Sequence, residues 1–222
     1  DELTFDMNLA YLDSEVGRLV EYLKVTDQYD DTIIVFLSDN GPEGNNIEDG
    51  LSNNREWLPV TFDQSFENMG KTNSYVALSR GWAHVSAGPL GQYKSFLGEG
   101  GVRVPAIISY PRVIQPNSQL GSLISIMDIA PTLMSFANVQ STHNYLMQGR
   151  SAEEILRDSP IRGEVRENLA METYGNKAVW EGNWKLLWSW ESQSWELFDL
   201  ENDPGETNDL SLSYPSRVES MV

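Results

Sequence analysis

Residues 31–46 read DTIIVFLSDNGPEGNN, an apolar and largely β-branched run that changes to polar and turn-forming residues after Leu37. Such a run predicts a strand covered on both faces, as in the parallel sheet of an α/β protein. Ligands of such sheets bind at the carboxyl ends of the strands, so Asp39 and Asn40 are candidate oxygen ligands for a hard cation. An Asx turn closed by Gly41 and Pro42 accounts for the same residues equally well.

The segments beside this strand predict a helix before it and irregular structure after it. Leucines and valines recur at helical spacing over residues 9–23 and predict an amphipathic helix that ends near Lys24. Residues 41–88 are rich in Asn and Gly. Long irregular segments in compact domains are usually functional, so we expect this one to form part of the rim of a substrate pocket.

A second strand and a further helix follow along the chain. Residues 102–109 predict a core strand that either lies near a sheet edge or begins after Pro105. Residues 128–137 predict a helix with Pro131 in its first turn. At its start Asp128 can cap the helix, so we expect a structural role for this carboxylate.

The carboxyl-terminal part predicts a second structural unit. Between residues 168 and 200 short apolar strands alternate with the turn-forming stretches GN and SQS, a pattern typical of an antiparallel sheet. Residues 139–163 are polar and predict a connection. We therefore expect two domains, residues 1–157 and residues 158–222.

Five motifs occur in a distinctive order: DNG at 39–41, YKSFLGEGGVRVP at 93–105, MDIAPTL at 127–133, GNWKLL at 182–187 and ELFDLENDPGE at 196–206. They closely resemble the carboxyl-terminal half of a type I sulfatase, of the arylsulfatase kind, in the alkaline-phosphatase-like superfamily. The resemblance extends over almost the whole chain. It implies an α/β fold, part of an alkaline-phosphatase-like mixed sheet flanked by helices, with a small carboxyl-terminal antiparallel sheet and a helix. Residues 1–157 would belong to the catalytic domain, and the amino-terminal half of the enzyme would be the partner of this chain.

The resemblance also implies roles for single residues. Asp39 and Asn40 correspond to two ligands of the family's Ca²⁺, whose other ligands lie in the amino-terminal half. Lys94 corresponds to the catalytic lysine that contacts a sulfate oxygen near the leaving group. His84 is a candidate substrate-pocket residue. Arg103 is a candidate sulfate-binding residue, with a structural ion pair beside the strand as the alternative.

The family nucleophile is a formylglycine, made from the first residue of a C/S-x-P-x-R motif in the amino-terminal half. This chain contains no cysteine, so we expect formylglycine outside it. Residues 213–217, SYPSR, match the serine form of the motif. They follow the carboxyl-terminal signature, however, and Pro215 predicts the first turn of a helix.

Trp180 stands where relatives commonly carry an arginine.

Composition excludes some functions and leaves others open. Fifteen basic residues face 33 acidic ones, for a formal net charge of −18, which argues against nucleic-acid binding. No run approaches the roughly 18 apolar residues of a membrane span, so we expect a soluble protein, periplasmic, secreted or cytoplasmic. The expected activity is metal-dependent hydrolysis of sulfate esters by the parent enzyme, with this chain inactive alone. The alternatives are a phosphonate monoester hydrolase or phosphodiesterase of the same superfamily, and a non-catalytic binding or assembly fragment.

Overall fold

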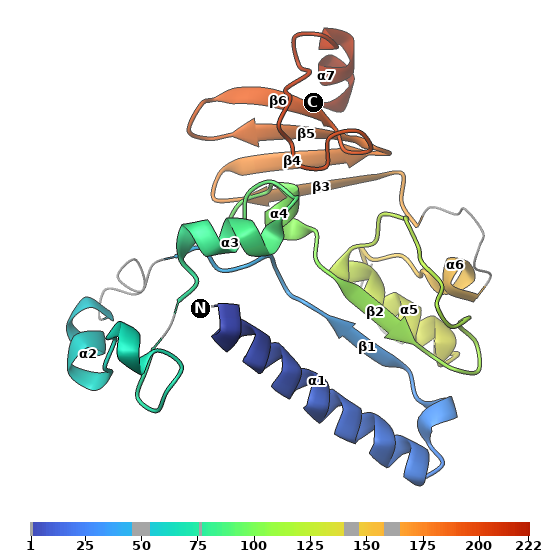
Figure 1. The fold of residues 1–222 in the computed structure, drawn as a ribbon. Helices are drawn as coiled ribbons and strands as arrows, with labels where there is room; N and C mark the ends of the chain where they lie inside the picture. Colours follow the sequence, from blue (N-terminus) through green and yellow to red (C-terminus); the bar gives the residue numbers. More distant parts are fainter. Residues whose placement is uncertain (1, 46–53, 76, 140–146, 158–164) are drawn as a thin grey trace.

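The computed structural model describes residues 2–45, 54–75, 77–139, 147–157 and 165–222 (Figure 1). Its two sheets lie on either side of α3 and α4. The elements are α1 (Glu2–Val25), β1 (Ile34–Leu37), α2 (Asn54–Thr61), α3 (Ser79–Ala87), α4 (Glu99–Val102), β2 (Ala106–Ser109), α5 (Ile129–Phe136), α6 (Glu153–Arg157), β3 (Asn168–Thr173), β4 (Asn176–Glu181), β5 (Trp184–Ser189), β6 (Ser194–Asp199) and α7 (Pro215–Met221), with short 3₁₀ turns at Tyr29–Asp31, Phe66–Asn68 and Ile126–Asp128.

The first strand differs from its prediction in pairing and in coverage. In the part of the chain that the structure describes, β1 pairs with β2 alone, and the pairing is antiparallel, with Ile34 opposite Ser109 and Leu37 opposite Ala106. The prediction of a parallel sheet is therefore wrong for this pair. No β1 side chain is fully buried, and Phe36 is 42% exposed. Apolar composition reports how a strand could be covered, and it carries no information on strand direction.

The helices confirm most of the predicted boundaries. α1 runs to Val25, although the apolar residues of its stripe, such as Leu9 and Leu19, remain about half exposed. β2 begins after Pro105, as one of the two alternatives predicted. The prediction of irregular structure over 41–88 is wrong for α2 and α3, two short helices that the Asn- and Gly-rich composition does not indicate. No helix in the described ranges is long and apolar enough to cross a membrane.

Asp128 has a structural role, as the sequence predicts, but its side chain does not cap α5 and instead closes a capping box with Ser125. It is fully buried and accepts hydrogen bonds from the backbone N–H groups of Ser125 (2.8 Å) and Arg150 (2.7 Å). The buried Arg166 guanidinium makes two further bonds to the same carboxylate, one of them from Nε to Oδ2 at 3.1 Å. Burial alone would raise the pKa of Asp128, but these donors outweigh it and hold the pKa below its ordinary value.

Replacing Asp128 by alanine is expected to destabilise the fold by about 3–5 kcal/mol, because Arg166 is left as a buried, unpaired cation. The folded-state pKa of Asp128 is lowered, so its contribution is present above the pKa of the unfolded chain and is lost as pH falls through the folded-state pKa. Urea unfolding measures both effects. The matched control is Arg157→Ala, which breaks the more exposed pair with Glu153 and should cost about 1 kcal/mol or less.

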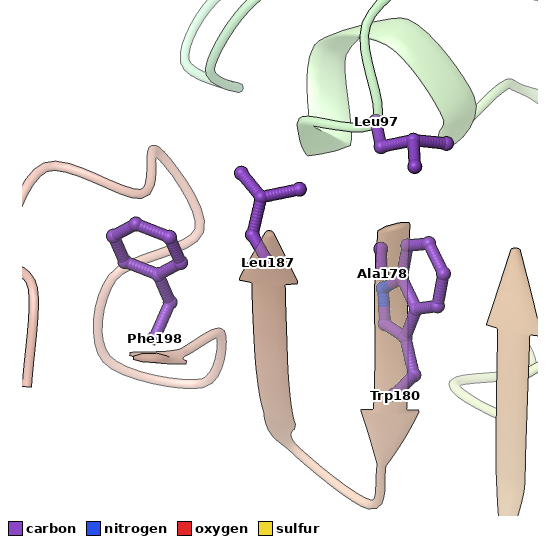
Figure 2. Packing of buried hydrophobic residues seen from close by; sticks show 5 residues of the cluster. All are labelled: Leu97, Ala178, Trp180, Leu187 and Phe198. Atoms are coloured by element: carbon purple, nitrogen blue, oxygen red, sulfur yellow. The ribbon is translucent and has the colours of Figure 1, made fainter. Parts of the chain in front are cut away.

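The carboxyl-terminal sheet confirms the predicted antiparallel arrangement, with strand order β3-β4-β5-β6. Alternation along the strands gives it two apolar faces. One face packs under α7, through Leu186, Leu197 and Met221. The other faces the loop before α4, where Leu97 packs against a cluster that contains Ala178, Trp180, Leu187 and Phe198 (Figure 2). The sheet is therefore joined directly to the segment that holds the EGG motif.

Candidate active site

The residues after β1 form a turn held by their own side chains. Ser38 Oγ donates to the carbonyl oxygen of Asn40 at 2.9 Å, and Asn40 Nδ2 donates to the carbonyl oxygen of Gly41 at 2.9 Å. This second bond occupies the amide nitrogen of Asn40 and leaves Oδ1 as its acceptor. The carboxylate of Asp39 is exposed and accepts no hydrogen bond from the described residues. Both residues therefore offer oxygen atoms to a ligand.

Glycines let this turn lie directly against α4. The Gly41 N–H donates to the carbonyl oxygen of Gly101 at 2.9 Å. A Cβ atom on Gly41 would stand 1.9 Å from the Gly100 carbonyl oxygen, closer than any side chain tolerates. Gly100 and Gly101 are equally restricted, because a Cβ on either would lie 2.3 Å from a carbonyl oxygen of the 91–96 loop. The DNG and EGG motifs are thus two halves of one close backbone contact.

Lys94 is joined to the same turn. Its backbone N–H donates to the carbonyl oxygen of Pro42 at 3.0 Å. Its Nζ lies 2.9 Å from Glu43 Oε2, while Glu43 Oε1 accepts a hydrogen bond from the Asn45 N–H at 3.0 Å. The structure therefore brings Lys94 together with the Asp39–Asn40 turn, although more than fifty residues separate them in the sequence.

The charges around Lys94 favour its protonated form. The hydrogen bond with Glu43 raises the pKa of Lys94 most, the charge of Glu43 adds to the effect, and Asp39 and Tyr174 contribute further. The pKa of Glu43 is lowered by the Asn45 N–H first and by Lys94 next. Both side chains are about 40% exposed, so water weakens the pair. At neutral pH the site therefore presents a protonated ammonium group, paired with Glu43 and partly open to water.

The other two candidate site residues are His84 and Arg103. His84, on α3, is exposed, and its ring meets Tyr93 edge to face with centroids 4.9 Å apart, so it neighbours the residue before Lys94. The Arg103 N–H donates to the carbonyl oxygen of Glu99 at 2.8 Å at the end of α4. The Arg103 side chain is exposed and has no ion pair within the described ranges.

Sequence reasoning missed Glu43. It lies two residues after the DNG motif, as the acidic residue of GPEG, and a carboxylate three positions from a predicted cation ligand is a signal that could have singled it out. Its structural role is to hold the free end of the Lys94 side chain. No local pattern relates the two residues, because they belong to different loops.

The donor set fits part of a calcium site. Asp39 and Asn40 offer oxygen atoms only, which suits a hard cation, and they lie on one turn held at two places by backbone hydrogen bonds. Ca²⁺ takes about 6–8 oxygen ligands. No group of three or more His, Cys, Asp or Glu residues that could hold a metal ion occurs within the described ranges. These two residues can therefore supply part of the coordination and no more.

This chain alone is expected to bind Ca²⁺ weakly, with a dissociation constant in the millimolar range or above, because affinity grows with the number of ligands and their rigidity. Isothermal titration calorimetry measures it. Tight stoichiometric binding that disappears in Asp39→Ala would show that the chain carries a complete site.

The SYPSR stretch begins a helix and does not join this site. Pro215 is the first residue of α7, as the sequence predicts. Arg217 lies 3.4 Å from Glu181 Oε2 and stacks over the Trp184 ring, 4.8 Å from its centre. In Figure 1, α7 packs on the four-stranded sheet at the end of the molecule opposite β1.

Two protein-family models match the chain, and together they cover most of its length. The one described as Sulfatase matches residues 3–139, and the one described as N-sulphoglucosamine sulphohydrolase, C-terminal, matches residues 90–218. The first match covers the DNG turn, Lys94 and the EGG motif, and the second extends through the carboxyl-terminal sheet.

Individual proteins and a solved structure are similar to the chain as well. An uncharacterized sulfatase of Schizosaccharomyces pombe is 32% identical over 95% of this chain and 40% of its own length. An arylsulfatase of Klebsiella aerogenes is 33% identical over 59% of this chain and 28% of its own. A solved structure from the glycosaminoglycan metabolism of Bacteroides thetaiotaomicron superposes with a TM-score of 0.67 at 22% identity, over 95% of this chain and 41% of that one. The chain thus spans well under half of each of these proteins.

Proposed function

The chain belongs to the sulfatase family, and from this premise we propose that its full gene product is a metal-dependent sulfuric ester hydrolase of the arylsulfatase kind. The fold is that part of the alkaline-phosphatase-like architecture that carries the DNG turn and the lysine loop. The proposal extends to the roles of Asp39, Asn40 and Lys94.

One observation carries the proposal. The Lys94 loop is bonded to the DNG turn through the Pro42 carbonyl oxygen, and the Lys94 ammonium lies beside Glu43, within electrostatic reach of Asp39. A cation held by Asp39 and Asn40, together with the Lys94 ammonium group in the same small region, would bind a sulfate ester from two sides. The family resemblance supplies the substrate class, because the same pair of groups could also hold a phosphoryl anion.

The residues of this chain then have defined tasks. Lys94 exchanges Glu43 for a sulfate oxygen and neutralises the charge that develops next to the departing alcohol. Glu43 holds the ammonium in place before substrate binds. Asp39 and Asn40 would hold Ca²⁺, which when bound supplies Lewis-acid polarisation of the sulfate group. His84, next to Tyr93, would contact the organic part of the substrate.

The remaining parts of the machinery are proposed to come from the amino-terminal half of the enzyme. These are the formylglycine nucleophile and the other ligands of Ca²⁺. The chain contains no cysteine from which formylglycine could be made. We therefore expect this chain alone to be inactive.

The test compares the full gene product with residues 1–222 alone on 4-nitrophenyl sulfate, in the presence of Ca²⁺. The proposal expects turnover by the full gene product and none by the chain alone. Turnover of a phenylphosphonate ester in preference to the sulfate would favour the phosphonate hydrolase alternative. Absence of turnover of either ester by the metal-replete, formylglycine-containing protein would favour the non-catalytic one.

Ser213→Ala is expected to leave both proteins unchanged, because Ser213 lies just before α7, which packs on the four-stranded sheet through Met221. The same turnover assay checks it. A large loss of activity in this variant would mean that the SYPSR stretch supplies the nucleophile.

A further inference from the structure

A buried ammonium group lies between two carboxylates on the inner face of the carboxyl-terminal sheet. Lys185, on β5, is fully buried, and its Nζ lies 3.0 Å from Glu99 Oε1 and 2.7 Å from Glu206 Oε1. The contact with Glu206 is close but is not oriented as a hydrogen bond. Trp180 donates from Nε1 to Glu99 Oε1 at 2.9 Å, and the ammonium lies 4.7 Å from the centre of its ring. Buried charges are costly unless they are held by partners, so these residues fix one another.

The cluster joins segments that are far apart in the sequence. Glu99 is the first residue of α4, and its N–H donates to Glu206 Oε2 at 2.6 Å. Glu206 has a φ of 56°, and the loop that carries it lies against the one before Lys94, since a Cβ on Gly91 would stand 2.7 Å from the Gly205 carbonyl oxygen. The sheet, the 203–206 loop and α4 therefore meet at Lys185.

From α4 the connection continues to both halves of the candidate active site. The carbonyl oxygen of Gly101 accepts the hydrogen bond from Gly41, next to Asp39 and Asn40. The Gly100 N–H donates to the carbonyl oxygen of Gly91 at 2.6 Å, three residues before Lys94. Leu97 anchors the same segment on the sheet beside Trp180 (Figure 2). The two hydrogen bonds join backbone to backbone, so they leave little room to adjust.

We propose that Lys185, paired with Glu99 and Glu206, is a positioning residue that holds α4 against the sheet and thereby sets the Asp39–Asn40 turn relative to Lys94. The effect on turnover rests on the proposed function, whereas the mechanical coupling of the two loops to the sheet does not. Lys185 touches no part of a substrate and acts through Glu99.

The charges of Lys185, Glu99 and Glu206 predict a pH dependence that apolar packing alone would not show. One ammonium faces two carboxylates, and burial raises the pKa of Glu206 against the attraction of Lys185. Lys185 and Glu99 are the titratable groups that act on Glu206. In Lys185→Met the two carboxylates have no cation, so one of them must hold a proton, which is lost as pH rises. In Lys185→Met/Glu206→Gln one carboxylate is gone, so the repulsion between the two is removed, while Glu99 keeps its hydrogen bond from Trp180.

Amide hydrogen exchange at single-residue resolution tests the coupling without any assay of activity. Lys185→Met should lower the protection factors of the Gly41 and Lys94 amides by about tenfold or more at pH 8, where the shared proton of the two carboxylates is lost. The loss should be smaller at pH 5, where that proton is retained, because each pH unit above a carboxyl pKa changes the protonated fraction about tenfold. The double variant should recover part of the protection and show a weaker pH dependence than Lys185→Met. Lys177→Met, an exposed lysine on β4, is the matched control and should change nothing.

Trp180→Phe is a second variant in case Lys185→Met does not fold, because it removes one hydrogen bond to Glu99 and keeps an aromatic ring at this position. It should lower protection at Gly41 by a few-fold. Unchanged protection at Gly41 and Lys94 in folded Lys185→Met would overturn the proposal, as would an equal loss throughout β5.

Turnover separates this proposal from the function it rests on. In the full gene product the variants should rank in the same order by their loss of kcat as by their loss of amide protection. KM should change less than kcat. If the wild-type protein hydrolyses no sulfate ester, the proposed function fails, and the exchange data still decide whether Lys185 positions the two loops.

Discussion

Lys94→Ala is expected to lower kcat for 4-nitrophenyl sulfate by about 10²–10³-fold in the full gene product, because one preorganised charge at the developing anion typically contributes that much. The fold should be unaffected, since the Lys94 side chain is 40% exposed and its backbone hydrogen bond to Pro42 does not depend on the side chain. Steady-state kinetics with matched circular dichroism spectra measure both. KM should change less than kcat, because the charge is needed most in the transition state.

Lys177→Ala serves as the control, as an exposed lysine on the neighbouring sheet. Lys94→Arg keeps the charge on a larger, planar group and should recover part of the rate at most. A Lys94→Ala enzyme with wild-type kcat would remove Lys94 from the catalytic machinery.

Gly41→Ala is the second variant with a large expected effect. Its Cβ would lie 1.9 Å from the Gly100 carbonyl oxygen and 2.9 Å from the carbonyl carbon, and both are backbone atoms that cannot rotate away. Either the DNG turn or α4 must move, which breaks the Gly41–Gly101 hydrogen bond. We expect a stability loss of about 1–3 kcal/mol or more, as for other overpacked sites. Turnover should fall more than tenfold, because Asp39 and Asn40 move with the turn.

Gly17→Ala is the matched control. Gly17 lies inside α1, and a Cβ there would meet nothing within 4 Å. The substitution should stabilise the helix by about 0.5–1 kcal/mol. Urea unfolding of both variants checks the contrast. A Gly41→Ala protein as stable and as active as the wild type would show that the turn and α4 are not in the close contact described above.

The parts of the site that the sequence predicts are those set by local chemistry. The DNG turn is recognisable because turn-forming residues follow an apolar run, and Asp128 is recognisable because it precedes the first turn of a helix. The strands after residue 168 alternate clearly and end at turn-forming residues, so their arrangement was predictable. In each case the determining residues are neighbours in the sequence.

The parts that were missed depend on residues far apart in the sequence. Glu99 and Lys185 are 86 positions apart, and neither motif indicates that the two side chains meet in the core. Trp180 stood out only as a departure from the family pattern, whereas the structure shows its ring nitrogen bonded to Glu99. Strand direction was also unpredictable, because apolar residues pack equally well in either orientation of β1.

The most direct measurement of the central claim, that the DNG turn and Lys94 form one site for sulfate esters, is a double-mutant cycle on kcat/KM for 4-nitrophenyl sulfate. It compares the wild-type full gene product with Asp39→Ala, Lys94→Ala and the variant that carries both. Residues that act on the same sulfate as a unit give strongly non-additive losses, so the combined loss should be far smaller than the product of the two single losses. Single losses that multiply, or an Asp39→Ala enzyme with full activity, would contradict the account.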